Sequence, residues 1–210
     1  MDPRHERLRL SVAIVLYDSA VSGNCYKVRL LFALLGVEYE RRPLSVVDKS
    51  DREDVLGGLN PGLRVPTVVL EDERSLGESG AILWYFADGT SYVPSDSFDR
   101  AKVLQWMFFE QYSHEPYVAV ARHWLMHDMA PSQEALAERQ RGGYAALDAL
   151  ERGLADGRAF LVDGYSIADI ALYTYTHVAH QGGFDLAGYP HIRAWLDRVA
   201  AQPSHVSIDA

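Results

Sequence analysis

Two polar side chains suited to chemistry, Ser22 and Asn24, lie close together in the stretch Ser22-Gly23-Asn24-Cys25. A β-branched apolar run over residues 12–16 precedes them, and apolar residues return at helical spacing over residues 28–35, which predicts strand, loop and helix. The hydroxyl, the amide and the free N–H groups of the first helical turn then meet where partial positive charge favours an anion. Phosphate sites normally carry a glycine-rich loop, which this stretch lacks, so we expect the anion to be a thiolate.

Neither Ser22 nor Cys25 has the surroundings of a nucleophile. No G-x-S-x-G elbow surrounds Ser22 and no general base is apparent, so its hydroxyl is expected to donate a hydrogen bond rather than to attack. Cys25 gives an S-x-x-C pattern, which lacks the first thiol of a C-x-x-C pair, so dithiol exchange cannot run. A helix N-terminus would lower the pKa of Cys25 and burial would raise it; we favour burial, as small core filler.

The composition is that of a globular chain with excess negative charge. Its 210 residues suffice for two domains of roughly 80 to 120 residues. The net charge of −9 argues against nucleic acid and acidic membranes as partners, since the longest basic run is Arg41-Arg42. The single cysteine fits a reducing compartment, and we expect a cytoplasmic protein. Residues 1–10 are expected to be a frayed extension and not a secretory signal, while the apolar window 167–179 is too short to span a bilayer.

Secondary-structure signals divide the chain into two parts. The first 88 residues predict the order β-α-β-α-β-β-α, with strands near 12–16, 38–44, 65–70 and 75–76 and helices ending near residues 35, 59 and 87. Only helical periodicity follows, over 101–127, 132–154, 166–179 and 191–201, with a kink expected at Pro116. We therefore expect an α/β domain over residues 10–88, a linker over 89–96 and an all-α domain over 97–210.

Two short motifs have both a ligand-binding and a structural interpretation. A cis Val65-Pro66 bond would turn the N–H and C=O of Val65 toward a ligand backbone, whereas a trans proline would simply start a strand. Glu78-Ser79 offers a carboxylate and a hydroxyl at a helix N-terminus, which suits a ligand with an ammonium and a carboxylate but also an ordinary N-cap. Ser166 and Asp169 form a capping box, for which the structural interpretation is preferred.

Histidine pairs in the second half do not predict a metal site. His123 and His127 lie four residues apart without the glutamate of an H-E-x-x-H motif, and His177 with His180 has no third ligand nearby in the sequence. We therefore expect no metal.

Aromatic residues are dense over 106–124. Most are expected to lie in the core, but Tyr112 and Tyr117 flank the expected kink at Pro116, where they would line a pocket.

In this order and spacing the motifs resemble those of the cytosolic glutathione S-transferases over about residues 12–203. The matching pieces are Leu16-Tyr17 before the Ser22 turn, Asn60-Pro61 ahead of Val65-Pro66, Glu78-Ser79, Ser166-x-x-Asp169, and Trp195-x-x-Arg198 before Pro203. The resemblance implies a thioredoxin-like N-terminal domain that binds glutathione as co-substrate, a helical domain that supplies the second substrate's pocket, and a homodimer.

The resemblance also implies roles for individual residues. Ser22 falls where the serine-type classes (theta-like and zeta-like) place the residue that stabilises the thiolate, and Asn24 where some bacterial (nu-like) relatives place an asparagine or cysteine with that role. Tyr17 lies inside the strand, so the tyrosine that follows the first strand in the alpha, mu and pi classes is missing, and Asn24 replaces the beta-class cysteine.

The other implied site residues surround the rest of the ligand. Val65, followed by a cis Pro66, would bond the cysteinyl part of glutathione, and Glu78 and Ser79 would hold its γ-glutamyl end. Lys49 and Arg64 are the available cations for the glycyl carboxylate, and the second-substrate pocket is expected from Tyr112, Tyr117 and Trp124 with their neighbours.

These expectations together predict a glutathione transferase that delivers the thiolate of glutathione to a small electrophile. Two alternatives stay open: a glutathione-dependent disulfide or peroxide reductase that uses two glutathiones, and a non-catalytic protein that binds glutathione or a hydrophobic ligand.

Overall fold

A computed structural model describes residues 14–210, and the predicted N-terminal extension and the first residues of the predicted first strand lie outside this range. The N-terminal half contains, in order, β1 (Ile14–Asp18), α1 (Gly23–Leu35), β2 (Tyr39–Pro43), α2 (Arg52–Leu56), β3 (Thr67–Val69), β4 (Ser75–Gly77) and α3 (Ser79–Ala87). This is the predicted β-α-β-α-β-β-α order. Residues 88–96 form no helix or strand, and we propose the domain division at this stretch.

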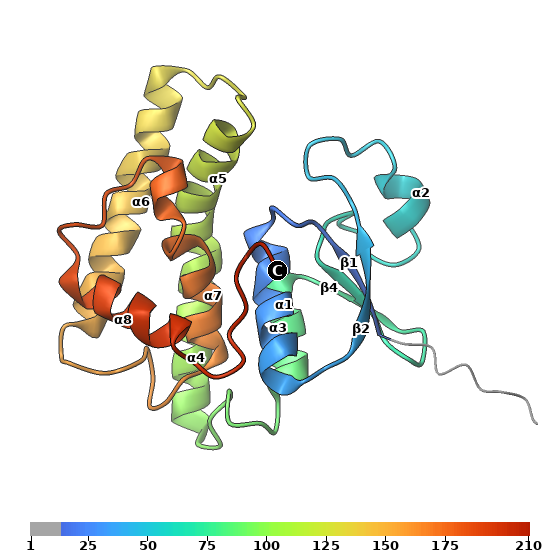
Figure 1. The fold of residues 1–210 in the computed structure, drawn as a ribbon, viewed down its shortest axis with the longest axis horizontal. Coiled ribbons are helices and arrows are strands. Elements are labelled where there is room, and N and C mark those ends of the chain that lie inside the picture. The colour runs from blue at the N-terminus through green and yellow to red at the C-terminus, as the bar shows by residue number, and fades with distance from the viewer. Residues whose placement is uncertain (1–13) are drawn as a thin grey trace, which may run out of the picture.

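The strands form one mixed sheet in the order β2-β1-β3-β4. β1 and β2 are parallel because the α1 crossover joins them, and the other two neighbouring pairs are antiparallel. Figure 1 shows α1 and α3 on the side of the sheet that faces the helical half, and α2 on the opposite side. The alternation along β1 explains these layers: Leu16 packs with residues of α1 and α3, whereas Val15 and Tyr17 pack with Leu56 of α2.

The second half is built from helices, and its described residues contain no β-strand. It contains α4 (Ser97–Phe109), the π-helix η1 (Glu110–His114), α5 (Glu115–Met126), α6 (Gln133–Leu154), α7 (Ile167–Thr176), the 3₁₀ turn η2 (Ala179–Gly182) and α8 (Pro190–Ala200). The irregularity expected at Pro116 begins earlier than predicted. A π-turn separates α4 from α5, and Pro116 sits in the first turn of α5, where its missing N–H is tolerated.

Helix α7 runs through the middle of the second half, and its start is fixed by the predicted capping box. The Ser166 hydroxyl caps the helix, while the buried Asp169 carboxylate accepts from the Ser166 N–H at 3.0 Å. Asp169 also accepts from the Trp195 indole N–H at 2.8 Å, which ties α7 to α8. The structural interpretation of this motif is confirmed.

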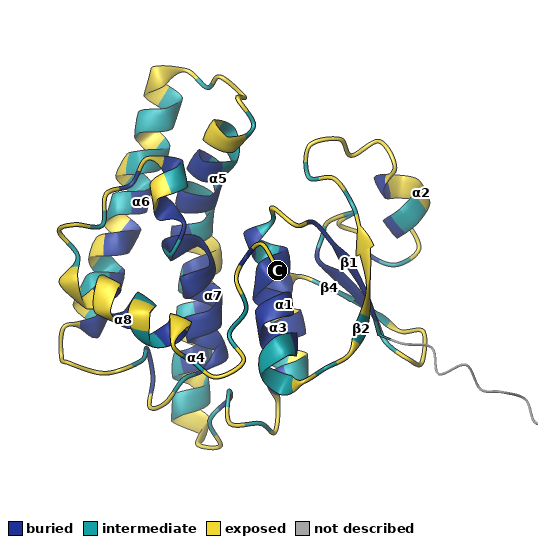
Figure 2. Ribbon diagram, viewed as in Figure 1, coloured by how far each residue is buried: buried dark blue, intermediate teal, exposed yellow. Residues whose placement is uncertain are grey.

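The largest hydrophobic cluster crosses the boundary between the two halves. Tyr26, Leu30 and Leu31 of α1 and Leu83 of α3 belong to the same buried cluster as the apolar residues of α7 and α8. Figure 2 shows α1 and α7 as the most continuously buried helices, lying side by side. Helix α1, including its N-terminus, therefore lies at the boundary with the helical half.

Candidate active site

A cleft of about 560 Å³ lies between the two halves at the N-terminus of α1. The N-terminal half contributes the turn at Ser22, the loop at Lys49 and the segment 62–65. The helical half contributes α5 and Tyr175. Ser22, Asn24, Lys49, Arg64 and Val65, all predicted from the sequence, line this one cleft.

Ser22 is the N-cap of α1. Its Oγ accepts from the Cys25 N–H at 3.3 Å, and its side chain is half-buried against the cleft. A hydroxyl accepts and donates at once, so the Ser22 proton stays available to a group in the cleft. No histidine or carboxylate among residues 14–210 bonds its Oγ, which agrees with a donor and not a nucleophile.

Asn24 is committed to a buried polar network. Its Oδ1 accepts from the Lys27 Nζ at 2.8 Å and from the Ser79 Oγ at 3.4 Å, and its Nδ2 donates to the Glu115 Oε1 at 3.2 Å. Lys27 in turn forms a buried ion pair with Glu110 at 2.8 Å. Asn24 therefore links α1, α3 and α5 beneath the cleft.

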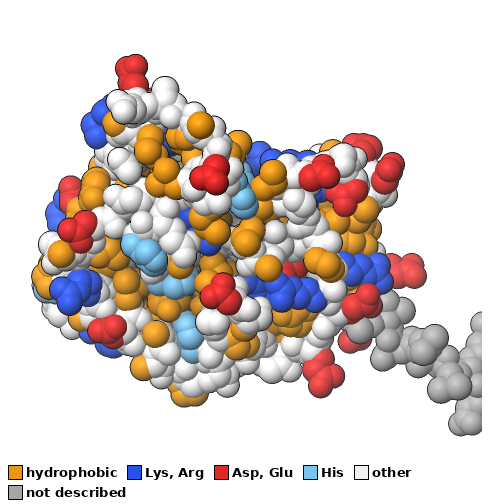
Figure 3. All heavy atoms as spheres, turned by 45° about the horizontal axis from the view of Figure 1, so that its top comes forward, with side chains coloured by type: hydrophobic (Ala, Val, Ile, Leu, Met, Phe, Trp, Pro, Cys, Tyr) orange, Lys and Arg blue, Asp and Glu red, His pale blue; other side chains and the backbone are white. Residues whose placement is uncertain are grey.

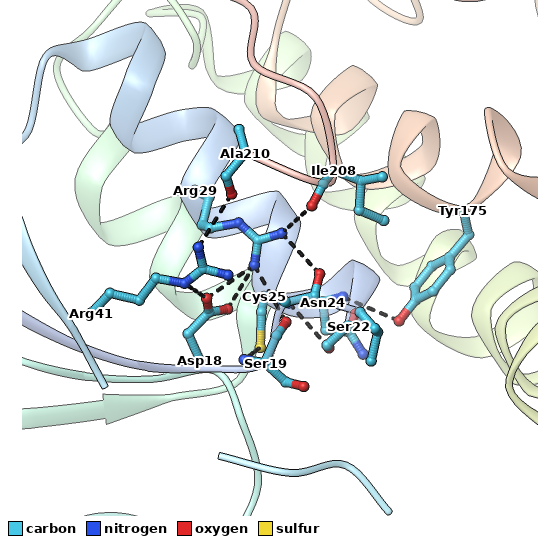
Figure 4. Close-up of polar contacts among 12 residues, drawn as sticks. Asp18, Ser19, Ser22, Asn24, Cys25, Arg29, Arg41, Tyr175, Ile208 and Ala210 are labelled. Carbon is cyan, nitrogen blue, oxygen red and sulfur yellow. Dashed lines mark hydrogen bonds and ion pairs between the residues drawn. The ribbon is translucent and has the colours of Figure 1, made fainter. Parts of the chain in front are cut away.

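Lys27, Glu110 and Tyr175 are polar residues of this site that the sequence analysis missed. The Tyr175 hydroxyl accepts from the Asn24 N–H at 3.1 Å, and Figure 4 shows the ring reaching from α7 to the first turn of α1. Burial, followed by the charges of Glu115 and Glu110, raises the pKa of Tyr175 well above its usual range, so the group remains a neutral phenol. No local signal revealed it, because Tyr175 stands in an apolar helical pattern.

The segment before β3 presents backbone to the cleft. The Val65-Pro66 bond is cis, as the resemblance implies, and no group among residues 14–210 bonds the N–H or C=O of Val65. Asn60 holds the preceding turn, because its Nδ2 donates to the Arg64 C=O at 3.2 Å and its Oδ1 accepts from the Gly62 N–H at 2.8 Å. These contacts fix the segment while leaving Val65 free for a ligand.

A further cation, Arg52, was not predicted. It lines the cleft at only 4% exposure, its Nη2 donates to the Ser45 C=O, and its Nε and Nη1 are buried without a partner among residues 14–210. Its place near Lys49 and Arg64 on the same wall gives the N-terminal half three cations in the cleft.

Glu78 and Ser79 lie at the start of α3, as predicted. Ser79 is buried and bonds Asn24, whereas Glu78 is exposed and has a positive φ of 63°. Neither lines the main cleft, and Glu78 instead borders a second, apolar hollow between α3 and α4.

The aromatic residues expected in the second-substrate pocket lie elsewhere. Tyr112 falls in the π-helix, where the extra residue per turn leaves it 84% exposed. Tyr117 and Trp124 point toward α6 and flank the Arg139 guanidinium. None of the three lines the cleft, whose α5 wall is instead formed by Ala119, Val120, His123, Met126 and His127.

Comparison with known proteins identifies the family. Residues 21–88 match the family model of the glutathione S-transferase N-terminal domain, and residues 133–198 match that of the C-terminal domain. A glutathione S-transferase-like protein of Aspergillus fumigatus is 30% identical over 202 residues, which cover 86% of this chain and 88% of the relative. The chain belongs to the glutathione S-transferase superfamily.

Other relatives agree in fold and differ in activity. The crystal structure of a glutathione S-transferase from Pseudomonas fluorescens is 45% identical, covers 93% of this chain and 98% of its own, and superposes with a TM-score of 0.89. A disulfide-bond oxidoreductase of Escherichia coli is 27% identical over 70% of this chain and 71% of its own length. Membership of the superfamily supports a glutathione-utilising enzyme and leaves the reaction to be determined.

The single cysteine of this superfamily member is buried, as expected. Cys25 is fully buried, and its Sγ accepts from the Ser19 N–H at 3.3 Å. Burial, followed by the nearby charge of Asp18, raises the pKa of the Cys25 thiol to about 12. Figure 4 shows the Asp18 carboxylate beside the thiol, where it forms ion pairs with Arg29 and Arg41. The thiol is therefore no nucleophile at neutral pH.

Two further features of the described residues concern metals and membranes. The rings of His123 and His127 lie 4.7 Å apart, yet residues 14–210 contain no group of three or more side chains suited to hold a metal ion. Within the same residues, every helix is too short or too polar to cross a bilayer.

Proposed function

We propose that the protein binds glutathione in this cleft and transfers its thiolate to a small electrophile, as a serine-type bacterial transferase. The observation that carries the proposal is the half-buried Ser22 hydroxyl, held at the N-terminus of α1; among residues 14–210 its proton has no acceptor and no base bonds it. The matched family models support glutathione as the co-substrate.

The proposed pose combines the backbone groups of Val65, which have no partner among residues 14–210, with the start of α3 and the cations of the cleft. The cysteinyl backbone would bond the N–H and C=O of Val65, beside the cis Pro66, and the γ-glutamyl end would reach Ser79 and Glu78 at the start of α3. The glycyl carboxylate would lie on the cationic wall formed by Lys49, Arg52 and Arg64. This pose places the sulfur at Ser22.

Chemistry in this pose is electrostatic. A free thiol with a pKa near 8.5 is only a few per cent ionised at pH 7. A hydroxyl donor and the free N–H groups of a helix N-terminus that lower this pKa by about two units supply roughly 2.7 kcal/mol of preferential thiolate stabilisation. The thiol proton leaves to solvent, and the thiolate attacks the electrophile.

Ser22 is the better candidate than Asn24 for the thiolate donor. The Asn24 side chain already bonds Lys27, Ser79 and Glu115, whereas the Ser22 proton has no partner among residues 14–210. We therefore expect Asn24 to hold α1, α3 and α5 together and not to bond the thiolate.

Ultraviolet titration of glutathione thiolate in the complex tests this assignment. Ser22→Ala should raise the bound thiol's pKa by about one unit or more, toward 8.5, while glutathione still binds, because Val65 and Ser79 hold the rest of the molecule. Asn24→Ala is the matched comparison and should change the pKa less. A shift in Asn24→Ala with none in Ser22→Ala would transfer the role to Asn24.

A reductase is the second candidate, supported by the disulfide-bond oxidoreductase among the relatives. Because Cys25 is buried, such a reaction would need two glutathiones and no protein thiol. Assays with an aryl halide, a mixed disulfide and a peroxide separate the candidates: turnover of the disulfide with none of the halide would favour the reductase. Glutathione binding without turnover would favour a non-catalytic protein.

We also propose a cytoplasmic homodimer. Phe98 and Phe108 of α4 are both 68% exposed, and Tyr85 of α3 and Tyr112 of η1 are exposed too, on elements that flank the apolar hollow between α3 and α4. Light scattering should give twice the chain mass of 23.5 kDa. Phe108→Glu should shift the mass toward the monomer, whereas Met129→Glu, an exposed apolar residue outside α3 and α4, should not.

A further inference from the structure

We infer that the electrophile carries a negatively charged group, such as a carboxylate, and that Arg122 on α5 binds it. This inference rests on the proposed function and adds the class of the second substrate.

Arg122 is a buried cation that forms no ion pair with any residue of the described range 14–210. It is 6% exposed, lines the cleft, and donates from Nε to the Gln181 Oε1 at 2.6 Å and from Nη1 to the Val21 C=O at 2.9 Å. Both partners are neutral, and no carboxylate among residues 14–210 lies within ion-pair distance. The remaining nitrogen, Nη2, has no hydrogen-bond partner in that range.

Arg29 of the same chain shows the usual arrangement. It is 3% exposed and bonds both carboxylate oxygens of Asp18, at 2.8 and 3.1 Å. A buried guanidinium without such a partner carries a desolvation cost that an anionic ligand would offset. Arg122 faces a cleft, so a ligand can supply that anion.

The cleft as a whole is cationic on an acidic protein. Its lining includes the cations Lys49, Arg52, Arg64 and Arg122 and a single carboxylate, that of Glu115, although the chain carries a net charge of −9. Asp209 lies near enough to Arg122 to influence it but forms no ion pair with it. Figure 3 shows basic and histidine side chains among apolar ones where the two halves meet.

Glutathione does not account for the charge on Arg122. In the proposed pose its two carboxylates lie at Ser79 and at the wall formed by Lys49, Arg52 and Arg64, all of which belong to the N-terminal half. Arg122 lies on the opposite wall and bonds the carbonyl of Val21, the residue before Ser22. An anion bound there sits beside the sulfur, where the electrophile must be.

The residues that line the cleft beside Arg122 indicate what the rest of the ligand is like. Ala119, Val120 and Met126 give the α5 wall an apolar surface, while His123 and His127 line the same wall. Burial lowers the pKa of His123, and the charges of His127, Lys49 and Arg122 lower it further, so His123 is neutral at pH 7 and offers one donor and one acceptor. These groups suit a small apolar or aromatic body with one anionic substituent.

A pair of aryl chlorides with the same reacting carbon tests the inference. The probes are 4-chloro-3,5-dinitrobenzoate and its methyl ester. In both, the glutathione thiolate forms a C–S bond, the C–Cl bond breaks, and chloride leaves with the electron pair. Each kcat/KM is divided by the uncatalysed rate constant of the same compound, which removes their difference in intrinsic reactivity.

We expect the normalised kcat/KM of the wild-type protein to favour the carboxylate by about tenfold or more, the size of one charge-assisted hydrogen bond. Arg122→Gln should abolish that preference and leave the ester within about threefold of wild type, since only the charged interaction is lost. Arg193→Gln removes a positive charge from an exposed position on α8 and should keep the preference. Equal normalised rates in the wild type would overturn the inference.

Arg122 has one competing role, direct stabilisation of the glutathione thiolate. In that case Arg122→Gln would raise the pKa of the bound thiol and slow both compounds by the same factor, and the inference would be wrong. The ester rate also reports any disturbance of the Val21–Ser22 turn.

Binding of the two conjugates separates this inference from the proposed function. If neither chloride is turned over, the transferase proposal fails, and calorimetry with the carboxylate conjugate of glutathione and with its methyl ester still tests Arg122. Tighter binding of the carboxylate conjugate, lost in Arg122→Gln, supports the inference, and equal affinities overturn it.

Discussion

The Asn24 N–H donates to the Tyr175 hydroxyl at 3.1 Å, across 151 positions of sequence. This bond fastens the first turn of α1, which carries Ser22 as its cap, to α7 in the other half of the molecule. The orientation of the proposed thiolate site therefore depends on a residue of the helical half.

Tyr175→Phe should remove this bond and leave a buried N–H without a partner. We expect a loss of about 1 to 3 kcal/mol in the free energy of unfolding, measured by urea denaturation. Tyr144→Phe is the matched control, because that hydroxyl also accepts a backbone N–H, from Asp185 at 3.0 Å, but at an exposed site where water can replace it. Equal losses in the two variants would show that burial of the Asn24 N–H does not add to the stability lost with its hydrogen bond.

Gly23→Ala should disturb the same contact from the other side. A methyl group at Gly23 would lie 2.4 Å from the Tyr175 Cε1 and 2.9 Å from the Thr174 Cγ2, so α1 and α7 must move apart. We expect a loss of about 1 to 3 kcal/mol in stability. The pKa of the thiol of bound glutathione should rise, because the first turn of α1 is displaced.

Gly80→Ala is the control for Gly23→Ala, since it too adds a methyl group in the first turn of a helix. Its closest contact would be the Met107 Cε at 3.5 Å, an ordinary distance. This variant should be neutral or slightly stabilising, and a comparable loss in both variants would contradict the steric explanation.

Cys25 should take no part in catalysis and should resist thiol reagents in the native protein. Since burial raises its pKa to about 12, a thiol reagent at pH 7 should label the native protein no faster than it opens by unfolding. Cys25→Ala should keep most transfer activity and cost about 1 to 2 kcal/mol of stability. Rapid labelling that glutathione blocks would reopen the redox interpretation.

The order of the elements could be predicted because each depends on local patterns. The capping box at Ser166 and the helix after Ser22 are specified by a few neighbouring residues. Tyr175, Arg122 and Arg52 could not be assigned in this way, because they come together at the cleft only when α5, α7 and the start of α2 lie beside the N-terminus of α1. The position of Tyr112 outside the cleft could not be predicted, because a π-turn changes the helical register by one residue and its sequence pattern resembles that of an uninterrupted helix.

His114 should give stability a pH dependence. The residue is fully buried with its Nε2 against the Thr176 Oγ1 at 3.1 Å, and burial, with the charge of Lys27, lowers its pKa to about 3. In the unfolded chain its pKa is near 6.5, so the unfolded state binds more protons between these values and stability falls as the pH drops below about 6.5.

His114→Leu should remove this contribution. Urea denaturation between pH 7.5 and 4.5 should show that the wild type loses up to about 1.4 kcal/mol per pH unit more than the variant below pH 6.5. A difference between the two proteins that stays constant with pH would mean that His114 titrates in the fold as it does in the unfolded chain, and the lowered pKa would be wrong.

The hydrophobic cluster shared by the two halves bears on modular engineering. Tyr26, Leu30, Leu31 and Leu83 belong to the N-terminal half by sequence but are covered by α7 and its neighbours. Expressed alone, residues 14–88 would expose this face to water and should aggregate or remain molten. A chimera that pairs this N-terminal half with a foreign helical half would have to exchange the covered faces of α1 and α3 as well, so the practical unit of recombination is the whole chain.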